Sequence, residues 1–175
     1  IIVNWESPAG SAGASYQIRP QWFSLGEAYD NWVATRTPPY FGTQPDARVS
    51  TLAAQAADPT AFPVLDIGAG TGRNALGLAR RGHPVDAVEM TPKFAEIIRA
   101  DAARDALNVR VLERNVFTTM SDLRRDYQLI VLSEVVSDFR STAQLTAVFE
   151  LAANCLAPGG RLVFNIFLAR GGYVP

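Results

Sequence analysis

The sequence predicts an α/β fold in which helices cover both faces of a parallel sheet, giving three layers. Three observations favour this fold. From residue 63 onward, short apolar segments alternate with helical patterns. A glycine-rich turn at 68–72 follows the first apolar segment, as in a nucleotide-binding strand–turn–helix unit. The second apolar segment ends in Glu89, at the end of a strand where open parallel sheets bind their ligands.

The composition fits a single domain without a nucleic-acid or membrane partner. The chain has 175 residues, 48% of them apolar and 19% charged, which is enough for a full hydrophobic core. Its 16 basic and 17 acidic residues are interleaved, so no basic face for nucleic acid is expected. No apolar run reaches the roughly 20 residues that span a bilayer, and no secretory signal opens the chain. We therefore expect a cytoplasmic setting.

No metal site is expected. His83 is the only histidine and Cys155 the only cysteine, and they lie too far apart to build a zinc site. Cys155 falls in an apolar helical pattern and is predicted to be a small buried side chain. His83 lies in a turn before a proline and is predicted to be exposed.

The first third of the chain is predicted to lie outside the sheet. Residues 1–15 are small, polar and rich in glycine and proline, which favours a flexible tail or linker. Residues 16–60 are predicted to form an N-terminal helical lid. Their apolar spacing favours one helix over 21–35 and a second over 45–57, separated by a proline-rich break.

Two interpretations of these aromatic-rich helices stay open. They pack on the core as ordinary helices, or they cover a ligand, because the crevice of an open sheet needs a cover from outside the sheet. In the second case Tyr29 or Tyr40 would face the ligand, and Arg36 would bind an anionic substrate.

Residues 61–175 are predicted to form the sheet and its helices. The expected strands cover residues 63–67, 85–89, 109–112, 129–132 and 162–167. The expected helices cover residues 73–81, a segment that begins at Thr91 and Pro92, and 141–156. Thr91 suits an N-cap and Pro92 a first helical turn. Because apolar strands alternate with helices, the sheet is expected to be parallel.

The glycine turn argues against a dinucleotide. Gly68, Gly70 and Gly72 have the spacing G-x-G-x-G, whereas a dinucleotide site needs G-x-G-x-x-G or A. Arg73 stands where that pattern requires its third small residue, and no Gly-Lys-Ser/Thr follows to form a phosphate loop. Glu89 can accept hydrogen bonds from both hydroxyls of a ribose. A nucleoside without a pyrophosphate is therefore favoured.

These motifs resemble those of the class I S-adenosylmethionine-dependent methyltransferases. Residues 64–72, VLDIGAGTG, are similar to the first motif of that family, and Glu89 in DAVEMTP matches the acid that closes its second strand. LAPGGRLVF is similar to its turn before the fifth strand. Within the family, the chain is most similar to small-molecule methyltransferases of the tellurite-resistance and thiopurine type. The resemblance implies a Rossmann-like core at 61–175 with S-adenosylmethionine as cofactor.

The resemblance also implies which residues hold that cofactor. The backbone of Gly68, Ala69 and Gly70 would contact the methionine part, with Asp66 beside the ammonium group and Glu89 on the ribose. The implied cofactor-binding set is Asp66, Gly68, Ala69, Gly70, Gly72, Glu89, Met90, Asn115, Val116 and Ser133.

The remaining implied roles concern the adenine and the methyl acceptor. Met90 would pack on the adenine face. Asn115, followed by Val116, stands where the family usually has an acid for the adenine amino group, and its side-chain carbonyl can still accept that hydrogen bond. Ser133 and Glu134, after the fourth strand, would lie beside the transferring methyl, and Glu134 is the candidate catalytic base.

The C-terminal end of the sequence predicts an uncovered sheet edge. Members of the family usually carry two further strands, and few residues follow Phe167 here. The strand at 162–167 would then be an apolar edge. We expect the native polypeptide to continue, or a partner chain to cover this edge.

Three functional hypotheses follow from the sequence. The first is an S-adenosylmethionine-dependent methyltransferase acting on a small molecule. The second is a non-catalytic domain that binds S-adenosylmethionine or S-adenosylhomocysteine. The third is an NAD(P)-binding oxidoreductase domain, which Arg73 and the absence of a Tyr-x-x-x-Lys pattern disfavour.

Overall fold

The computed structural model describes residues 24–118 and 121–166. The chain divides into two compact units, with the boundary between Arg36 and Thr37. The predicted tail at 1–15 lies outside the described residues, as do the beginning of the predicted lid and the last nine residues of the chain.

The first unit contains one described helix, α1 (Leu25–Thr35). It begins with a capping box: the Ser24 hydroxyl accepts from the Glu27 N–H at 3.2 Å, and the Glu27 carboxylate accepts from the Ser24 N–H at 2.7 Å. The Arg36 guanidinium lies 3.8 Å from the centre of the Trp32 ring. The helix expected at 21–35 is thus present over its described part.

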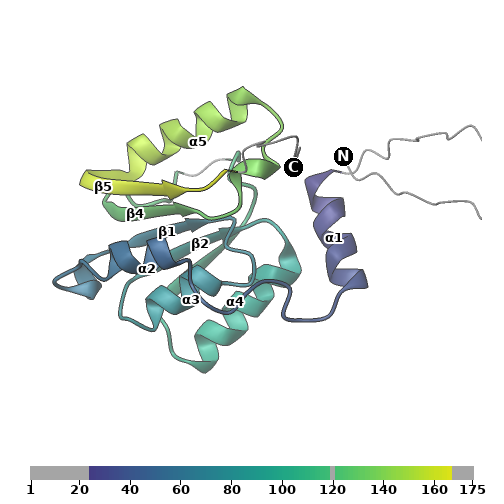
Figure 1. Ribbon diagram of the computed structural model, residues 1–175, viewed down its shortest axis with the longest axis horizontal. Helices are drawn as coiled ribbons and strands as arrows, with labels where there is room; N and C mark the ends of the chain where they lie inside the picture. Colours follow the sequence, from purple (N-terminus) through teal and green to yellow (C-terminus); the bar gives the residue numbers. More distant parts are fainter. Residues whose placement is uncertain (1–23, 119–120, 167–175) are drawn as a thin grey trace, which may run out of the picture. The chain divides into compact units, whose positions relative to one another are not determined.

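The second unit is built on a five-stranded parallel sheet with the order β3-β2-β1-β4-β5 (Figure 1). The strands are β1 (Val64–Ile67), β2 (Val85–Glu89), β3 (Val109–Glu113), β4 (Tyr127–Leu132) and β5 (Leu156–Phe164). The strand order reverses between β1 and β4, which is the point where open α/β sheets bind ligands. The predicted parallel sheet is confirmed.

Helices cover both faces of this sheet, which confirms the predicted three layers (Figure 1). The α-helices are α2 (Ala47–Ala53), α3 (Arg73–Ala79), α4 (Pro92–Arg104) and α5 (Thr142–Cys155), and the short 3₁₀ helices are η1 (Pro59–Ala61) and η2 (Val136–Asp138). Residues of α2, α3 and α4 pack in one buried cluster, and those of α5 in the other.

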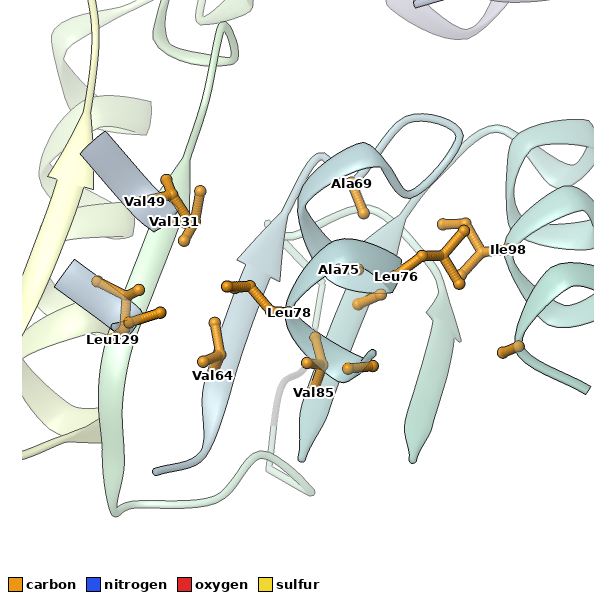
Figure 2. Close-up of a cluster of buried hydrophobic side chains, with 14 residues drawn as sticks. Val49, Val64, Ala69, Ala75, Leu76, Leu78, Val85, Ile98, Leu129 and Val131 are labelled. Atoms are coloured by element: carbon orange, nitrogen blue, oxygen red, sulfur yellow. The ribbon is translucent and has the colours of Figure 1, made fainter. Parts of the chain in front are cut away.

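Alternation along the strands separates the two clusters. Val64 of β1 packs with Val85 and Leu78 on the α3 side (Figure 2), whereas its neighbour Leu65 packs with Val148 on the α5 side. Successive side chains of a strand point to opposite faces, so a strand buried on both sides reads as a continuous apolar run.

The predicted lid at 16–60 is divided in the structure. Residues 37–60 belong to the sheet-containing unit, because Val49 and Ala53 of α2 are buried in the core beside α3. The Asp46 N–H donates to the Asn74 side chain at 2.8 Å. A Cβ on Gly77 of α3 would lie 2.3 Å from the Pro45 side chain, so the segment before α2 also packs tightly on α3.

Two local expectations differ from the structure and one agrees. The prediction that His83 is exposed is wrong: it is 1% exposed, with Nδ1 3.2 Å from the Phe62 carbonyl oxygen. Helix α5 ends at Cys155 and β5 begins at once, so Pro158 lies within the irregular first part of β5 and not before it. Cys155 is buried, as predicted.

Strand β5 forms one edge of the described sheet and β3 the other. The position of β5 agrees with the predicted edge. Phe164 at its end and Ile166 beyond it are among the exposed large apolar side chains.

Candidate functional site

The site begins at the glycine turn between β1 and α3. Gly68, Gly70 and Gly72 all have positive φ, at 67°, 57° and 87°, a conformation that side chains with a Cβ rarely adopt. A Cβ on Gly68 would lie 2.5 Å from Val135, and one on Gly70 3.1 Å from Phe41. The turn is therefore closely packed by the segments on either side of it.

Asp66 lies at the end of β1, just before this turn, and is 1% exposed. One carboxyl oxygen accepts from the Ala75 N–H of α3 at 3.1 Å. Burial raises the pKa of Asp66 to about 7, against the opposing effects of the Ala75 N–H and the Arg73 charge. A cation brought to this carboxyl would favour its ionised form.

Glu89 ends β2 and is 5% exposed. One carboxylate oxygen accepts from the Gly70 N–H at 2.8 Å and the other from the Thr91 N–H at 2.7 Å. Burial raises the pKa of Glu89, and these two N–H groups and the Thr91 hydroxyl oppose the rise. A carboxylate offers about four lone-pair positions, so each oxygen can still accept from a ligand.

Thr91 adds an unsatisfied group beside Glu89. Its hydroxyl oxygen is buried and has no partner at hydrogen-bond geometry, the only such side-chain atom among the described residues. Buried hydroxyls without a partner are uncommon and call for an explanation. The nearest polar partner is the Glu89 carboxylate, because the Thr91 hydroxyl is among the groups that lower the pKa of Glu89. A small rotation of the hydroxyl toward Glu89, or a polar ligand at this edge of the sheet, would complete the hydrogen bond.

The end of β4 carries Ser133 and Glu134, which both meet Arg73 of α3. The Arg73 Nη2 donates to the Ser133 hydroxyl at 3.0 Å and to the Glu134 carboxylate at 2.9 Å. Glu134 has φ 64°, in the left-handed region, and its N–H donates to the Asn165 side chain at 2.5 Å. Three segments far apart in the sequence thus converge beside the turn.

The adenine-side candidates follow β2 and β3. Met90 is half-buried, and Val116 packs at the border of the α5-side cluster. The Asn115 side-chain oxygen accepts from the Phe117 N–H at 2.9 Å, so it already caps its own turn. The role predicted for Asn115 toward an adenine stays a prediction.

Aromatic side chains lie beside the turn. The rings of Tyr40 and Phe41 have their centres 5.4 and 5.3 Å from that of Phe94 in α4, and Phe41 also packs against Gly70. Tyr29 and Arg36 belong to the other unit of the chain, where Tyr29 packs edge-on against Trp32 at 5.9 Å.

Residues 64–160 match the sequence family described as "Methyltransferase domain". The chain belongs to this family. It is 24% identical over 108 residues to the ubiquinone biosynthesis O-methyltransferase of Xanthomonas axonopodis pv. citri (strain 306), covering 62% of this chain and 44% of the relative. It is 26% identical over 99 residues to the enzyme of that name from Xylella fastidiosa (strain M23), covering 57% and 39%. The chain thus spans less than half the length of these relatives.

Solved structures share the fold of this methyltransferase domain. A protein solved in work on the conversion of a disulfide bond into a thioacetal group during echinomycin biosynthesis has a TM-score of 0.67 at 20% identity, covering 80% of this chain and 60% of its own. TehB from Haemophilus influenzae has a TM-score of 0.59 at 20% identity, covering 68% and 40%. The glycopeptide N-methyltransferase MtfA complexed with S-adenosylmethionine has a TM-score of 0.56 at 22% identity, covering 74% and 58%.

The methyltransferase domain gathers most of the predicted site residues at one edge. Asp66, Glu89, Asn115 and Ser133 all lie at or just after the carboxyl ends of parallel strands, each on a different strand. Sequence reasoning missed four contacts around these strand ends: Arg73 with Ser133, Phe41 with Gly70, Val135 with Gly68, and Asn165 with Glu134. Nothing in the spacing of these residues marks the contacts, because each is made only in the folded chain.

Metal and membrane features are absent from the described part of the chain. Within residues 24–118 and 121–166, no group of three or more His, Cys, Asp or Glu side chains could hold a metal ion. No helix in these ranges has the length and apolar character needed to cross a bilayer.

Proposed function

We propose that this chain is an S-adenosylmethionine-dependent methyltransferase that acts on a small molecule. One observation carries the proposal: the Glu89 carboxylate at the end of β2 is hydrogen-bonded to Gly70 in the turn that follows β1. The acid and the glycine turn are thereby fixed side by side at the switch point of the sheet. The methyltransferase names of the relatives support the same activity.

The residues present fit the proposed cofactor. The glycine turn exposes no Cβ at Gly68 or Gly70, with Ala69 between them and Gly72 as the N-cap of α3. Val135 and Phe41 fill the positions that a Cβ would take on Gly68 and Gly70, so the methionine part would approach the rest of the turn backbone. The buried Asp66 carboxyl would pair with the ammonium group. A charge buried away from water is stabilised best by an opposite charge beside it.

The nucleoside part would be held at the ends of β2 and β3. Glu89 would accept from the ribose hydroxyls with its remaining lone pairs, and the buried Thr91 hydroxyl would gain a partner there. Met90 and Val116 would border the adenine. Asn115 would serve the adenine amino group only with the lone pair that the Phe117 N–H leaves available.

When bound, the cofactor supplies a methyl group on a positively charged sulfur. The chain's own part is to align the acceptor with that methyl and to exclude water, which together lower the barrier by several kcal/mol. Ser133 and Glu134 would line the acceptor side. Glu134 would act as a base for acceptors that must lose a proton. Tyr40, with Phe41 beside it, would cover the turn, and Tyr29 and Arg36 stay candidates in the lid predicted over 16–60.

A small-molecule acceptor in the cytoplasm completes the proposal. The even balance of 16 basic and 17 acidic residues supports an acceptor other than a nucleic acid. We also propose that further polypeptide or a partner chain covers β5, because this strand is an edge with Phe164 exposed.

The main rival is a domain that binds S-adenosylmethionine or S-adenosylhomocysteine without catalysis. Calorimetry with these two ligands and with NAD tests the cofactor class. We expect both sulfur nucleotides to bind and NAD not to bind; binding of NAD alone would overturn the proposal. Formation of S-adenosylhomocysteine over a panel of thiols, amines, phenols and carboxylic acids then separates the enzyme from the binding domain.

A further inference from the structure

A cavity of about 200 Å³ lies next to the amino ends of β1 and β4, on the face of the sheet that α2 and α3 cover. Leu52 of α2, Phe62 before β1 and Leu129 of β4 form its apolar side. Asp66 and Glu89, in contrast, lie at the carboxyl ends of their strands. The cavity is therefore separate from the site described above.

A guanidinium borders this cavity. Arg161 of β5 is in register with Leu129, and Val163, two residues later, packs on the α3 side of the sheet, so Arg161 points to the same face. Its Nη1 donates to the Gln55 Oε1 at 2.6 Å. Within the described residues this is its one side-chain hydrogen bond, and no carboxylate pairs with it. Because a guanidinium carries five N–H donors, most of those of Arg161 are open to a ligand.

Two carboxamides add hydrogen-bond donors beside Arg161. Gln55 accepts from Arg161 with its oxygen, which leaves its NH₂ group to donate. The Gln128 side chain also lines the cavity, and it has no hydrogen bond to any other described residue. None of the described residues that line the cavity is acidic. The polar side of the cavity thus combines a positive charge with amide donors, which favours an oxyanion.

The start of β5 leaves room for a ligand at Gly159. A Cβ on Gly159 would meet nothing within 4 Å, whereas one on Gly160 would lie 2.7 Å from the Tyr127 carbonyl oxygen. The chain is therefore held close to β4 at Gly160 and leaves open space at Gly159. Pockets for drug-sized molecules have volumes of about 300–1,000 Å³, so this smaller cavity suits a compact ligand.

We propose that this cavity binds a small organic anion in which a carboxylate is joined to a compact apolar body. The carboxylate would accept from the Arg161 guanidinium and from the two carboxamides. The apolar body would pack on Leu52, Phe62 and Leu129, where burial of apolar surface adds to the affinity. This site is distinct from the proposed methyltransferase site, and its ligand binds whether or not the cofactor is present.

Benzoate, benzamide and acetate test the proposal, because benzamide lacks the charge and acetate lacks the ring. Each is titrated into isotope-labelled protein while the backbone N–H signals are followed by NMR. We expect benzoate to bind about tenfold more tightly than either of the others, with the signals of Leu52, Gln128 and Leu129 shifting most. Absence of benzoate binding, or equal affinity for all three, would overturn the proposal.

The same titration with S-adenosylhomocysteine present separates the two proposed sites. Benzoate affinity should be the same with and without this nucleotide. Competition between them would place benzoate in the cofactor site and overturn the inference. Failure of S-adenosylhomocysteine to bind would count against the proposed function alone.

Variants assign the binding to Arg161. Arg161→Gln should lower benzoate affinity about tenfold and leave benzamide affinity nearly unchanged, and Arg161→Lys should retain part of the preference. Gln128→Glu keeps the Arg161–Gln55 hydrogen bond but adds a carboxylate that competes with the ligand, so it should also weaken benzoate binding. Arg99→Gln is the control, because Arg99 pairs with Glu113 of β3, at the other edge of the described sheet. Unchanged benzoate affinity in both Arg161→Gln and Gln128→Glu would overturn the proposal.

A purely structural role for Arg161 predicts a different result. Arg161 joins β5 to Gln55, just after α2, so Arg161→Gln should lower the melting temperature in either case. Only a binding site makes the wild-type melting temperature rise with benzoate and not with benzamide, and makes that rise disappear in Arg161→Gln. An equal rise in both proteins would show that Arg161 only ties the two segments together.

Discussion

Replacing Asp66 by Asn should stabilise the protein at neutral pH while weakening the binding of the cofactor. The carboxyl is buried at the end of β1, and its pKa rises from an ordinary 3.8 to about 7. At a pH well above 7 the folded protein must therefore carry a buried charge. The difference between the two pKa values corresponds to roughly 4 kcal/mol, at about 1.4 kcal/mol for each pH unit.

The sign of the pH dependence follows from the raised pKa. The folded state keeps a proton on Asp66 that the unfolded chain loses between pH 3.8 and about 7. The contribution of Asp66 to stability is thus fully present below pH 3.8 and is lost as the pH rises through 7. Asn does not titrate, and its side-chain oxygen can still accept from the Ala75 N–H, as Asp66 does.

Urea unfolding of wild type and Asp66→Asn at several pH values between 4 and 8.5 measures this effect. The two proteins should be nearly equally stable at pH 4, and the variant should gain up to roughly 4 kcal/mol over wild type by the alkaline end. Asp126→Asn is the control, because Asp126 is exposed and its pKa is lowered by Arg124. A difference that stays constant with pH, or grows in the opposite direction, would refute the reasoning.

The same residue should make cofactor binding depend on pH. An ammonium group pairs only with the ionised carboxyl, so wild-type affinity should rise with pH up to about 7 and fall again above about 8, where an α-amino group loses its own proton. In Asp66→Asn the rise should be absent, so the variant should bind more weakly than wild type near pH 7 and about equally well at low pH, where Asp66 is neutral. Asp66 would release its proton when the ammonium group binds, and calorimetry in buffers of different ionisation enthalpy would detect that proton.

The observed contacts predict the effect of three further substitutions on stability or binding. Glu89→Gln places an NH₂ group where a carboxylate oxygen now accepts a backbone N–H. The variant should lose about 1–3 kcal/mol of unfolding free energy in urea and bind S-adenosylhomocysteine more weakly. A variant unchanged in both measurements would contradict the proposed site. Gly68→Ala should cost about 1–3 kcal/mol because its Cβ would lie 2.5 Å from Val135. Gly159 also has a positive φ, 79°, but a Cβ on it would have nothing within 4 Å, so Gly159→Ala should lose less stability than Gly68→Ala. Equal losses would show that the Val135 side chain moves to make room for the Gly68 methyl group. Asp86→Asn should cost about 3 kcal/mol in thermal unfolding, because the buried Asp86 carboxylate of β2 pairs with Arg110 of the neighbouring strand β3 and with the Tyr127 hydroxyl of β4. A loss below about 1 kcal/mol would show that the network tolerates a neutral member.

The sheet could be predicted because its signal is local. Strand β1 is a short apolar run followed by Gly68, and β2 is one closed by the acid Glu89. The β2 strand matches its predicted residues, 85–89, at both ends. The lid could not be separated from the core in the same way. A helix such as α2, with Val49 and Ala53 on one face, has the same pattern whether it covers a ligand or packs on a sheet.

Burial of polar residues was the other limit of the sequence. His83 is buried because the Phe62 carbonyl lies 3.2 Å from its ring nitrogen and the Phe62 ring packs against it at 5.3 Å. The spacing of residues around Pro84 in the sequence indicates neither contact. A histidine between a helix and a strand is solvated or buried according to what its neighbour in space offers, and only the folded chain supplies that neighbour.

The two halves of the site differ in how the chain encodes them. The proposed donor half comes from one continuous stretch, from Asp66 to Thr91, in which a turn and an acid are joined by the Gly70–Glu89 hydrogen bond. The residues proposed for the acceptor side come from separate segments: Arg73 donates to Ser133 and Glu134, and the Glu134 N–H donates to Asn165. Substitutions of Glu134 or Asn165 are therefore expected to change the acceptor side with little effect on the proposed donor half. Such a division would allow one fold to serve many acceptors, and it explains why a short motif identifies the family while the acceptor must be argued from contacts across the sheet.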